Sequence, residues 1–317
     1  MLLRLACHSA TTYSHPRVWS QLTQAEAKHL RSRTRAAIRR TLLERVYPAR
    51  GTRLRTRRAS LMFDCASVAD ELAASVDPRL DETYLRCVPS AAGRGPVLLV
   101  GVVHDHPSSI ARVTTVLELF EPETLALELP PLAMPLFRQY ADDEHRPPRL
   151  GGEMSAAIQA TDAPAIGVDA PTVTYLRRLL ESVRQERPPR GVLSRLLRDL
   201  GSMAMHAFAT RVASAVGRRS PVRLRVYDPI EHDASLLDTQ ESQATHERSF
   251  LSQRAALFGA IHPPEATRLI DDAREVAISD LLDSARADGA VVAVLGMEHL
   301  DPVEAELRRS ADEATDV

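Results

Sequence analysis

Short, continuous apolar runs recur along the chain from about residue 96 onward, and glycine, proline or charged residues bound each of them. Runs of this length without polar interruption are typical of strands that are covered on both faces of a sheet. They predict five strands, at residues 96–103, 124–130, 163–171, 222–229 and 290–296.

Between these runs, apolar residues recur at the three- and four-residue spacing of amphipathic helices. In residues 108–122, Ile110, Val113 and Val116 share one helical face, and Pro122 ends the segment. Further helices are predicted at residues 151–161, over most of 172–219, and at 240–258, 264–287 and 301–309. Strands that alternate with helices predict an α/β fold with a central, mostly parallel or mixed sheet flanked by helices.

The first 60 residues differ from the rest in charge. They hold 13 Arg and one Lys against two Glu, whereas the remaining positions carry 26 basic and 40 acidic side chains. One helix is predicted there, from Thr23 with Glu26 in a capping box to Pro48. We therefore divide the chain into a basic arm, 1–60, and an α/β domain, 61–317, with its core at 96–309.

The arginine face of the arm helix is compatible with several functions. It could bind nucleic acid or an anionic membrane, but no aromatic residues interleave the arginines, which argues against nucleic acid. The simpler interpretation is a solvated helix.

Composition and cysteine usage narrow the class of protein. The chain of 317 residues is 44% hydrophobic and 4% aromatic, so it has an aliphatic core, and it contains no apolar run long enough to span a membrane. No secretory leader is recognised, and we expect a soluble, cytoplasmic protein. Cys7, Cys65 and Cys87 are far apart and odd in number, which predicts free, reduced thiols.

Chemically reactive residues follow the predicted strands. His104 ends the first strand, Glu128 the second, Asp169 the third and Asp228 the fourth, and His299 lies just past the fifth. The carboxyl ends of parallel strands meet at one edge, where α/β proteins bind their ligands. Two imidazoles and several carboxylates at one edge predict a divalent-metal site.

Both histidines belong to a Gly-x-x-His motif, at Gly101–His104 and Gly296–His299. Glycine lets the backbone turn sharply off a strand, and the repeated strand–Gly-x-x-His–helix unit suggests an internal duplication. A third copy at 259–262 follows no strand and is set aside.

Each of these residues also has a structural interpretation. Strand-end histidines often serve as caps, and Asp169 and Asp228 lie just before prolines, where aspartate forms turns. His106 fits a supporting role beside His104. Glu128 is harder to dismiss, because a carboxylate within "LALELPPL" is costly to bury unless it is paired.

Residues 98–309 resemble the TraB/PrgY domain of the Tiki-type superfamily, which includes erythromycin-esterase-like and ChaN-like proteins. The resemblance rests on five ordered motifs, "GVVHDHPSSIARV", "LALEL", "GGEMSAAI", "IGVDAPTVTYLRR" and "VVAVLGMEHLDPVE". It implies an α/β fold with a metal-dependent hydrolase site. Some members of the superfamily are proteases acting on peptide signals, and others are esterases.

The chain departs from the family pattern at several arginines. Ala133 stands where an arginine usually follows the strand glutamate, and Ala170 where the aspartate is usually followed by arginine. In place of the family's Glu-Arg pair before the last strand, the chain has Arg274-Glu275 in reversed order and, further back, Glu247-Arg248.

The leading hypothesis is a metal-dependent hydrolase that acts on a peptide or amide bond. His104 and His299 would bind Zn, Mn or Co, with Glu128 or Glu153 completing the shell and a remaining carboxylate as general base. Arg178 or Arg274 would hold a substrate carboxylate or stabilise the oxyanion.

Two alternatives remain open. A non-catalytic protein could bind a peptide or small molecule in the same cleft, which the replaced arginines favour. A nucleic-acid binder would use the basic arm. The proline-rich insert at 130–152 is expected to overhang the cleft, or to be a linker.

Overall fold

The computed structural model describes residues 63–91, 93–217, 225–226, 228–259 and 264–315. The predicted basic arm, its helix and Cys7 lie outside these residues. The described residues all belong to one compact unit and fall within the predicted α/β domain.

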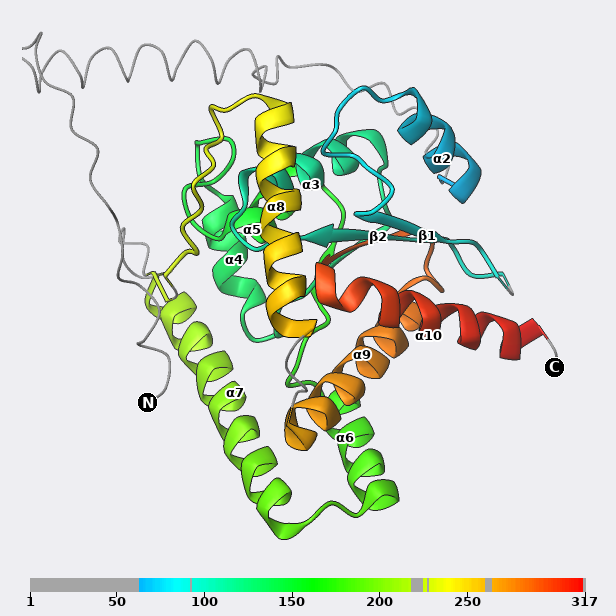
Figure 1. Ribbon diagram of the computed structural model, residues 1–317, viewed down its shortest axis with the longest axis vertical. Coiled ribbons are helices and arrows are strands. Elements are labelled where there is room, and N and C mark those ends of the chain that lie inside the picture. The colour runs from blue at the N-terminus through cyan, green and yellow to red at the C-terminus, as the bar shows by residue number, and fades with distance from the viewer. Residues whose placement is uncertain (1–62, 92, 218–224, 227, 260–263, 316–317) are drawn as a thin grey trace, which may run out of the picture. The chain divides into compact units, whose positions relative to one another are not determined.

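The domain is built on a five-stranded mixed sheet in the order β1-β2-β5-β3-β4 (Figure 1). The strands are β1 Leu85–Val88, β2 Val97–Val102, β3 Thr124–Leu127, β4 Ala165–Gly167 and β5 Val291–Gly296. Strand β1 runs antiparallel to β2, and every other neighbouring pair is parallel. This confirms the predicted α/β class and its mostly parallel sheet.

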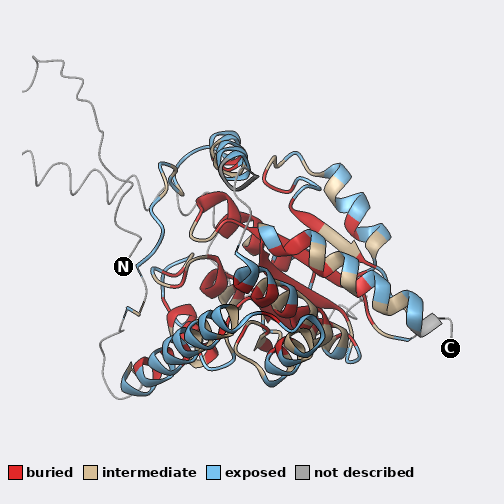
Figure 2. Ribbon diagram, turned by 60° about the horizontal axis from the view of Figure 1, so that its bottom comes forward, coloured by how far each residue is buried: buried red, intermediate tan, exposed pale blue. Residues whose placement is uncertain are grey.

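The helices cover both faces of the sheet (Figures 1 and 2). Their bounds are α2 Cys65–Ala74, α3 Pro107–Leu119, α4 Met134–Ala141, α5 Gly152–Ala160, α6 Val173–Glu186, α7 Arg190–Gly217, α8 Gln240–Gly259, α9 Glu265–Ala285 and α10 Met297–Thr315.

The central strands alternate between two cores because successive side chains point to opposite faces. Leu98 and Val100 of β2 join the cluster that includes residues of α3, α4 and α5. Val97 and Leu99 join the cluster that includes residues of α9 and α10. All these side chains are buried, so the continuous apolar runs in the sequence reflect a sheet that is covered on both sides.

The sheet has five strands, but one of them is not among the five that were predicted. The described positions of 222–229, which are 225, 226, 228 and 229, are not in a strand, and Asp228 is exposed. The sheet is completed instead by β1, whose four residues are buried only at the two ends of the strand. Because this short edge strand lacks a continuous apolar run, the sequence pattern does not predict it.

The insert at 130–152 contains a helix that the sequence did not predict. Helix α4 contributes Leu136, Phe137 and Tyr140 to the core, so this part of the insert is neither a linker nor an overhanging loop.

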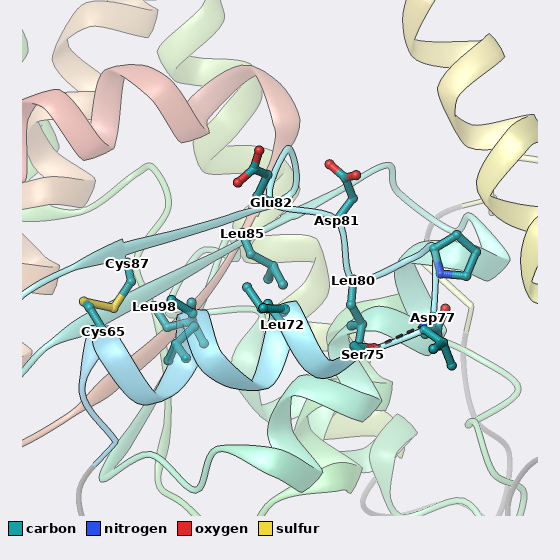
Figure 3. Close-up of a pocket in the computed structure, with 15 residues that line it drawn as sticks. Cys65, Leu72, Ser75, Asp77, Leu80, Asp81, Glu82, Leu85, Cys87 and Leu98 are labelled. Atoms are coloured by element: carbon teal, nitrogen blue, oxygen red, sulfur yellow. Dashed lines mark hydrogen bonds between the residues drawn. A yellow bond between two sulfur atoms is a disulfide. The ribbon is translucent and has the colours of Figure 1, made fainter.

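The prediction of free thiols is wrong for two of the three cysteines. Cys65, at the start of α2, and Cys87, on β1, form a disulfide with a Cα–Cα distance of 5.5 Å (Figure 3). Sequence spacing could not show this pairing, because it depends on how the unpredicted edge strand lies beside α2. The disulfide borders a cavity of about 550 Å³, which also involves Leu72, Leu80 and Leu85.

Within the part of the chain that the structure describes, there is no helix with the length and apolar character needed to cross a membrane.

Candidate active site

The strand register brings the predicted residues to one edge of the sheet. Val102 of β2 pairs with Gly296 of β5, so His104 and Glu298 each lie two residues beyond a paired position. The Glu128 N–H donates to the carbonyl of Val294 over 3.1 Å, which places Glu128 on the other side of β5. The register thus places His104 and Glu128 at the carboxyl edge of the parallel strands, and His299 follows Glu298 there, whereas Asp228 follows no strand.

Glu128 is buried and paired, as its apolar setting requires. Its Oε1 accepts a hydrogen bond from Nη2 of Arg274 at 2.6 Å, and its Oε2 accepts one from the backbone N–H of Gly296 at 2.5 Å. A Cβ on Gly296 would lie 3.2 Å from this Oε2 and 3.1 Å from Oε2 of Glu298. The glycine of the second Gly-x-x-His motif thus allows two carboxylates to approach the strand end.

His299 lies in the first turn of α10, between two carboxylates. Its Nδ1 is 3.2 Å from Oε1 of Glu275, and its Nε2 is 3.4 Å from Oε1 of Glu128. Burial lowers the pKa of His299, but the hydrogen bond to Glu275 and the charge of Glu128 outweigh it, so the pKa is raised.

His104 follows β2 and is paired with a buried carboxylate of α5. Its Nδ1 lies 2.7 Å from Oε1 of Glu153, whose Oε2 accepts the backbone N–H of Asp105 at 2.9 Å. The hydrogen bond to Glu153 raises the pKa of His104 to about 9. Asp105 has a positive φ of 59° and packs against Gly152, where no Cβ would fit, so the turn after β2 depends on that glycine.

The two imidazoles lie within the electrostatic reach of the same carboxylates. The charges of Glu128 and Glu298 act on the pKa of both His104 and His299. The side chains do not form a ready metal cage, however, since no group of three His, Cys, Asp or Glu in the described residues is arranged to hold an ion.

Of the two predicted arginines, only Arg274 reaches this edge. Its Nε contacts Asp169 Oδ1 at 2.5 Å, and its Nη2 contacts both Asp169 Oδ2 and Glu128 Oε1. Arg178 instead forms a two-point ion pair with Asp280 of α9, at 2.7 and 2.8 Å. Asp280 is six residues past Arg274, or roughly 9 Å along the helix, so Arg178 ties α6 to α9 outside the site.

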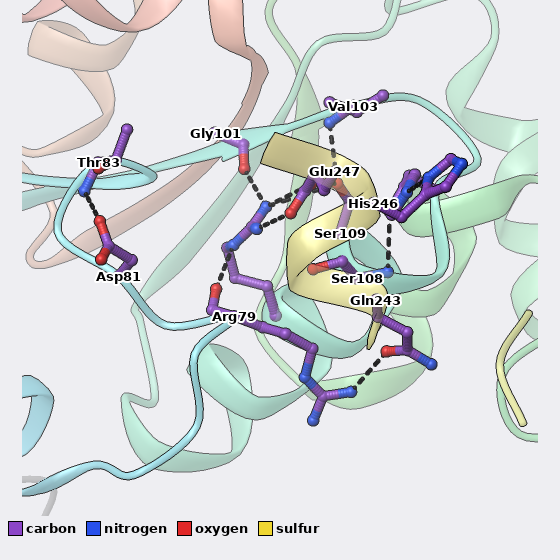
Figure 4. A network of polar contacts seen from close by, with 12 residues as sticks. Arg79, Asp81, Thr83, Gly101, Val103, Ser108, Ser109, Gln243, His246 and Glu247 are labelled. Atoms are coloured by element: carbon purple, nitrogen blue, oxygen red, sulfur yellow. Dashed lines mark hydrogen bonds and ion pairs between the residues drawn. The ribbon is translucent and has the colours of Figure 1, made fainter. Parts of the chain in front are cut away.

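Glu247, in the other candidate Glu-Arg pair, belongs to a separate buried network (Figure 4). It pairs with Arg112 of α3, and both side chains are fully buried. Arg112 also donates to the carbonyls of Gly101 and Arg79, at 2.8 and 2.6 Å, while Ser109 donates its hydroxyl to Glu247 at 2.6 Å. This network fixes α3 and α8 against the end of β2 and holds the loop that carries His104.

Two histidines that the sequence did not single out support the same loop. His232 donates from Nε2 to the carbonyl of His104 over 2.8 Å. His246 of α8 lies with Nδ1 3.0 Å from Nε2 of His106, which caps α3 by accepting the N–H of Ser108. Burial lowers the pKa of His106 to about 4, so this ring is neutral near pH 7. No local pattern marks His232 or His246, because both are brought in by tertiary packing.

A cavity of about 520 Å³ adjoins the site on the side of Asp169. Its walls come from the segments that follow β3 and β4 and from one face of α7. The lining residues are Pro130, Asp169, Ala170, Asp199, Ser202, Met203 and His206. The site therefore combines histidine–carboxylate pairs, a shared arginine and an adjoining space for a ligand.

Neither a protein-family model, nor a curated protein, nor a solved structure matches this chain, so the resemblance to the TraB/PrgY domain rests on its five motifs alone.

Proposed function

We propose that the protein is a metal-dependent hydrolase of the TraB/Tiki type that acts on a peptide or amide bond. The observation that supports this most is the meeting of His104, His299 and Glu128 at one sheet edge, each with a carboxylate or arginine partner. Edges of this kind are where α/β proteins bind ligands.

The chemistry of the donor set fits a divalent metal. In each imidazole, Nδ1 is held by a carboxylate, Glu153 or Glu275, so Nε2 would be the nitrogen that binds an ion; that of His299 already faces Glu128 Oε1 at 3.4 Å. A carboxylate on the far ring nitrogen is the usual way to orient a metal-binding histidine. Glu153 is thus better suited to orienting His104 than to binding the ion itself, and Glu128 is the carboxylate that could complete the shell. Because these side chains do not yet surround one point, binding would require small rotations.

A metal bound there would supply an activated water and polarise the scissile carbonyl; Zn, Mn and Co all accept such mixed donors. Side chains of the protein would act as general base and stabilise the oxyanion. Glu298 has a lowered pKa, because its backbone hydrogen bond and the charge of Arg254 outweigh the effect of burial, so it is ionised. Its Oε1 accepts a hydrogen bond from Arg254 at 2.8 Å, and its Oε2 would be the oxygen that acts as general base. Arg274 uses Nε and Nη2 for its ion pairs, which leaves Nη1 to donate to a developing oxyanion.

A non-catalytic binding protein is the alternative. It is favoured by Ala133 and Ala170, which stand where the related pattern has arginines, and by the engagement of Arg274 with two carboxylates. Such a protein would take up a peptide or small molecule at the same edge without cutting it.

Metal content and hydrolysis, measured separately, distinguish the two. The full chain is titrated with Zn²⁺, Mn²⁺ and Co²⁺ by calorimetry, and its cleavage of a defined peptide mixture is followed by mass spectrometry. We expect one tightly bound ion, lost in His104→Gln and His299→Gln. His145→Gln is the matched control, since His145 is also paired with a buried carboxylate, Asp143 at 3.0 Å.

Metal binding that survives both substitutions, or that is lost equally in His145→Gln, would contradict the assignment. A stoichiometric metal without cleavage of any peptide would favour the binding protein.

A further inference from the structure

The 520 Å³ cavity beside Asp169 has no part in the chemistry described so far. It lies between the residues that follow β3 and β4 and helix α7, so it extends the sheet edge away from His104 and toward the helical face. A group that entered it would be attached to a substrate whose reacting bond lies beside Glu128 and Arg274. The cavity is therefore placed to select a neighbouring part of the substrate.

Its walls carry negative charge. Asp169 lines the cavity and is held by Arg274, but that single guanidinium is shared with Glu128, so one positive charge faces two carboxylates. Asp199 lines the cavity from α7, and its carboxylate forms no hydrogen bond or ion pair within the described residues. Charge complementarity thus favours a cation over a neutral or anionic group.

An unsatisfied hydroxyl belongs to a residue packed behind the wall of the cavity. Tyr175 is 1% exposed, and its Oη has no hydrogen-bond partner in the described residues. Burial raises its pKa to about 12, and Tyr175 belongs to the buried cluster that contains the cavity-lining Ala170 and against which Met203 packs. Buried polar groups without a partner are rare and costly, and this one adjoins the side chains that form the cavity wall.

The apolar part of the lining suits the stem of a long side chain. Met203, Pro130 and Ala170 border the same space, and Met adapts its shape to irregular neighbours. Lysine and arginine bury such a stem while the charged end finds polar partners.

We infer that this cavity binds the cationic side chain, an ammonium or guanidinium group, of the residue next to the scissile bond, with Asp199 as its counter-ion. The inference rests on the proposed function for the identity of that bond. The occupancy of the cavity does not depend on cleavage and can be measured by itself.

The experiment uses the full chain without divalent ions and three probes of matched size: the N-acetyl, N′-methylamide derivatives of lysine, norleucine and glutamate. Their dissociation constants are measured by NMR titration. We expect the lysine probe to bind about tenfold more tightly than the norleucine probe, the difference that one charge-assisted hydrogen bond makes. Asp199→Asn should abolish the difference, while Asp312→Asn, a carboxylate of α10 that does not line the cavity, should leave it unchanged.

Equal binding of the lysine and norleucine probes, preference for the glutamate probe, or a lysine preference that survives Asp199→Asn would overturn the inference. Thermal unfolding of Asp199→Asn confirms that the helix is intact. Lysine preference in a protein that binds no metal and cuts no peptide would leave the cavity assignment standing and remove the hydrolase proposal. Metal-dependent cleavage without any lysine preference would leave the hydrolase proposal standing and remove the cavity assignment.

Discussion

Two ion-pair networks lie at the same edge of the sheet, and they differ in how completely they are satisfied. Arg112 and Glu247 are both fully buried, and the contacts of the arginine go to one carboxylate and two backbone carbonyls. Arg274 has 23% of its side chain exposed, and it serves two carboxylates that adjoin a cavity and a histidine with a raised pKa.

The difference separates a buried charge that holds elements together from one that can serve a ligand. A network whose partners are all internal holds elements together, and losing one member leaves an uncompensated charge. A network that shares one cation among several carboxylates, next to titratable rings and an open space, has capacity left for a ligand. Burial alone would have ranked Glu247 above Glu128 as a functional residue, and the environment reverses that order.

We expect the largest effect on stability from breaking the fully buried Arg112–Glu247 pair. Glu247→Gln leaves Arg112 buried without its counter-ion and should lower the free energy of unfolding by about 3–5 kcal/mol. Glu128→Gln should cost less than half of that, since Arg274 keeps Asp169. Urea denaturation monitored by circular dichroism measures both. Equal costs would remove the distinction between the networks.

The next effect concerns the carboxylate that orients His104. Glu153→Gln weakens the hold on Nδ1 and should reduce metal affinity about 10- to 100-fold. Asp143→Asn breaks a similar carboxylate–histidine pair, with His145, away from the sheet edge, and should leave metal affinity unchanged. Calorimetric titration of both variants tests this, and a similar loss in each would point to a general destabilisation.

The His104–Glu153 pair and the Arg112–Glu247 network should respond to opposite ends of the pH range. The pKa of His104 is raised to about 9 by Glu153, so its stabilising contribution is complete below the ordinary value of 6.5 and is lost as the pH rises through 9. Burial raises the pKa of Glu247, but the charge of Arg112 outweighs it and the pKa is lowered. Its contribution is therefore present above the ordinary value of 4.5 and is lost as the pH falls through the lowered pKa.

Unfolding free energies of the wild type, His104→Gln and Glu247→Gln, measured from pH 2 to 10 without divalent ions, separate these windows. The difference between wild type and His104→Gln should shrink between pH 6.5 and 9. A difference that stays constant across that interval would show that the His104–Glu153 pair does not titrate as described.

The smallest effect comes from the unsatisfied hydroxyl. Tyr175→Phe removes a buried group without a partner and should raise the free energy of unfolding by about 1 kcal/mol. Tyr140→Phe is the matched control, since Tyr140 is equally buried and its hydroxyl bonds to the backbone of Val226. It should lower stability by a similar amount, and destabilisation by Tyr175→Phe would show that its hydroxyl is satisfied.

The sequence by itself determined the parallel core of the sheet and the residues that end its strands. Continuous apolar runs predicted β2, β3, β4 and β5, and the chain must place His104, Glu128, Asp169 and His299 just beyond them because strand ends are fixed by the local pattern. Short or partly exposed elements such as β1 and α4 carried no such pattern and were missed.

The tertiary structure alone decided which of those residues have partners. The position of β5 between β2 and β3 places His299 beside Glu128. Arg274 and Glu275 join the site because α9 turns that side toward the sheet, whereas Arg178 is held at Asp280. A charged residue on a helix looks the same in sequence whether it faces solvent or a site, since its orientation follows from how the whole helix packs. The Cys65–Cys87 bond and the cavity beside α7 depend on the same long-range packing.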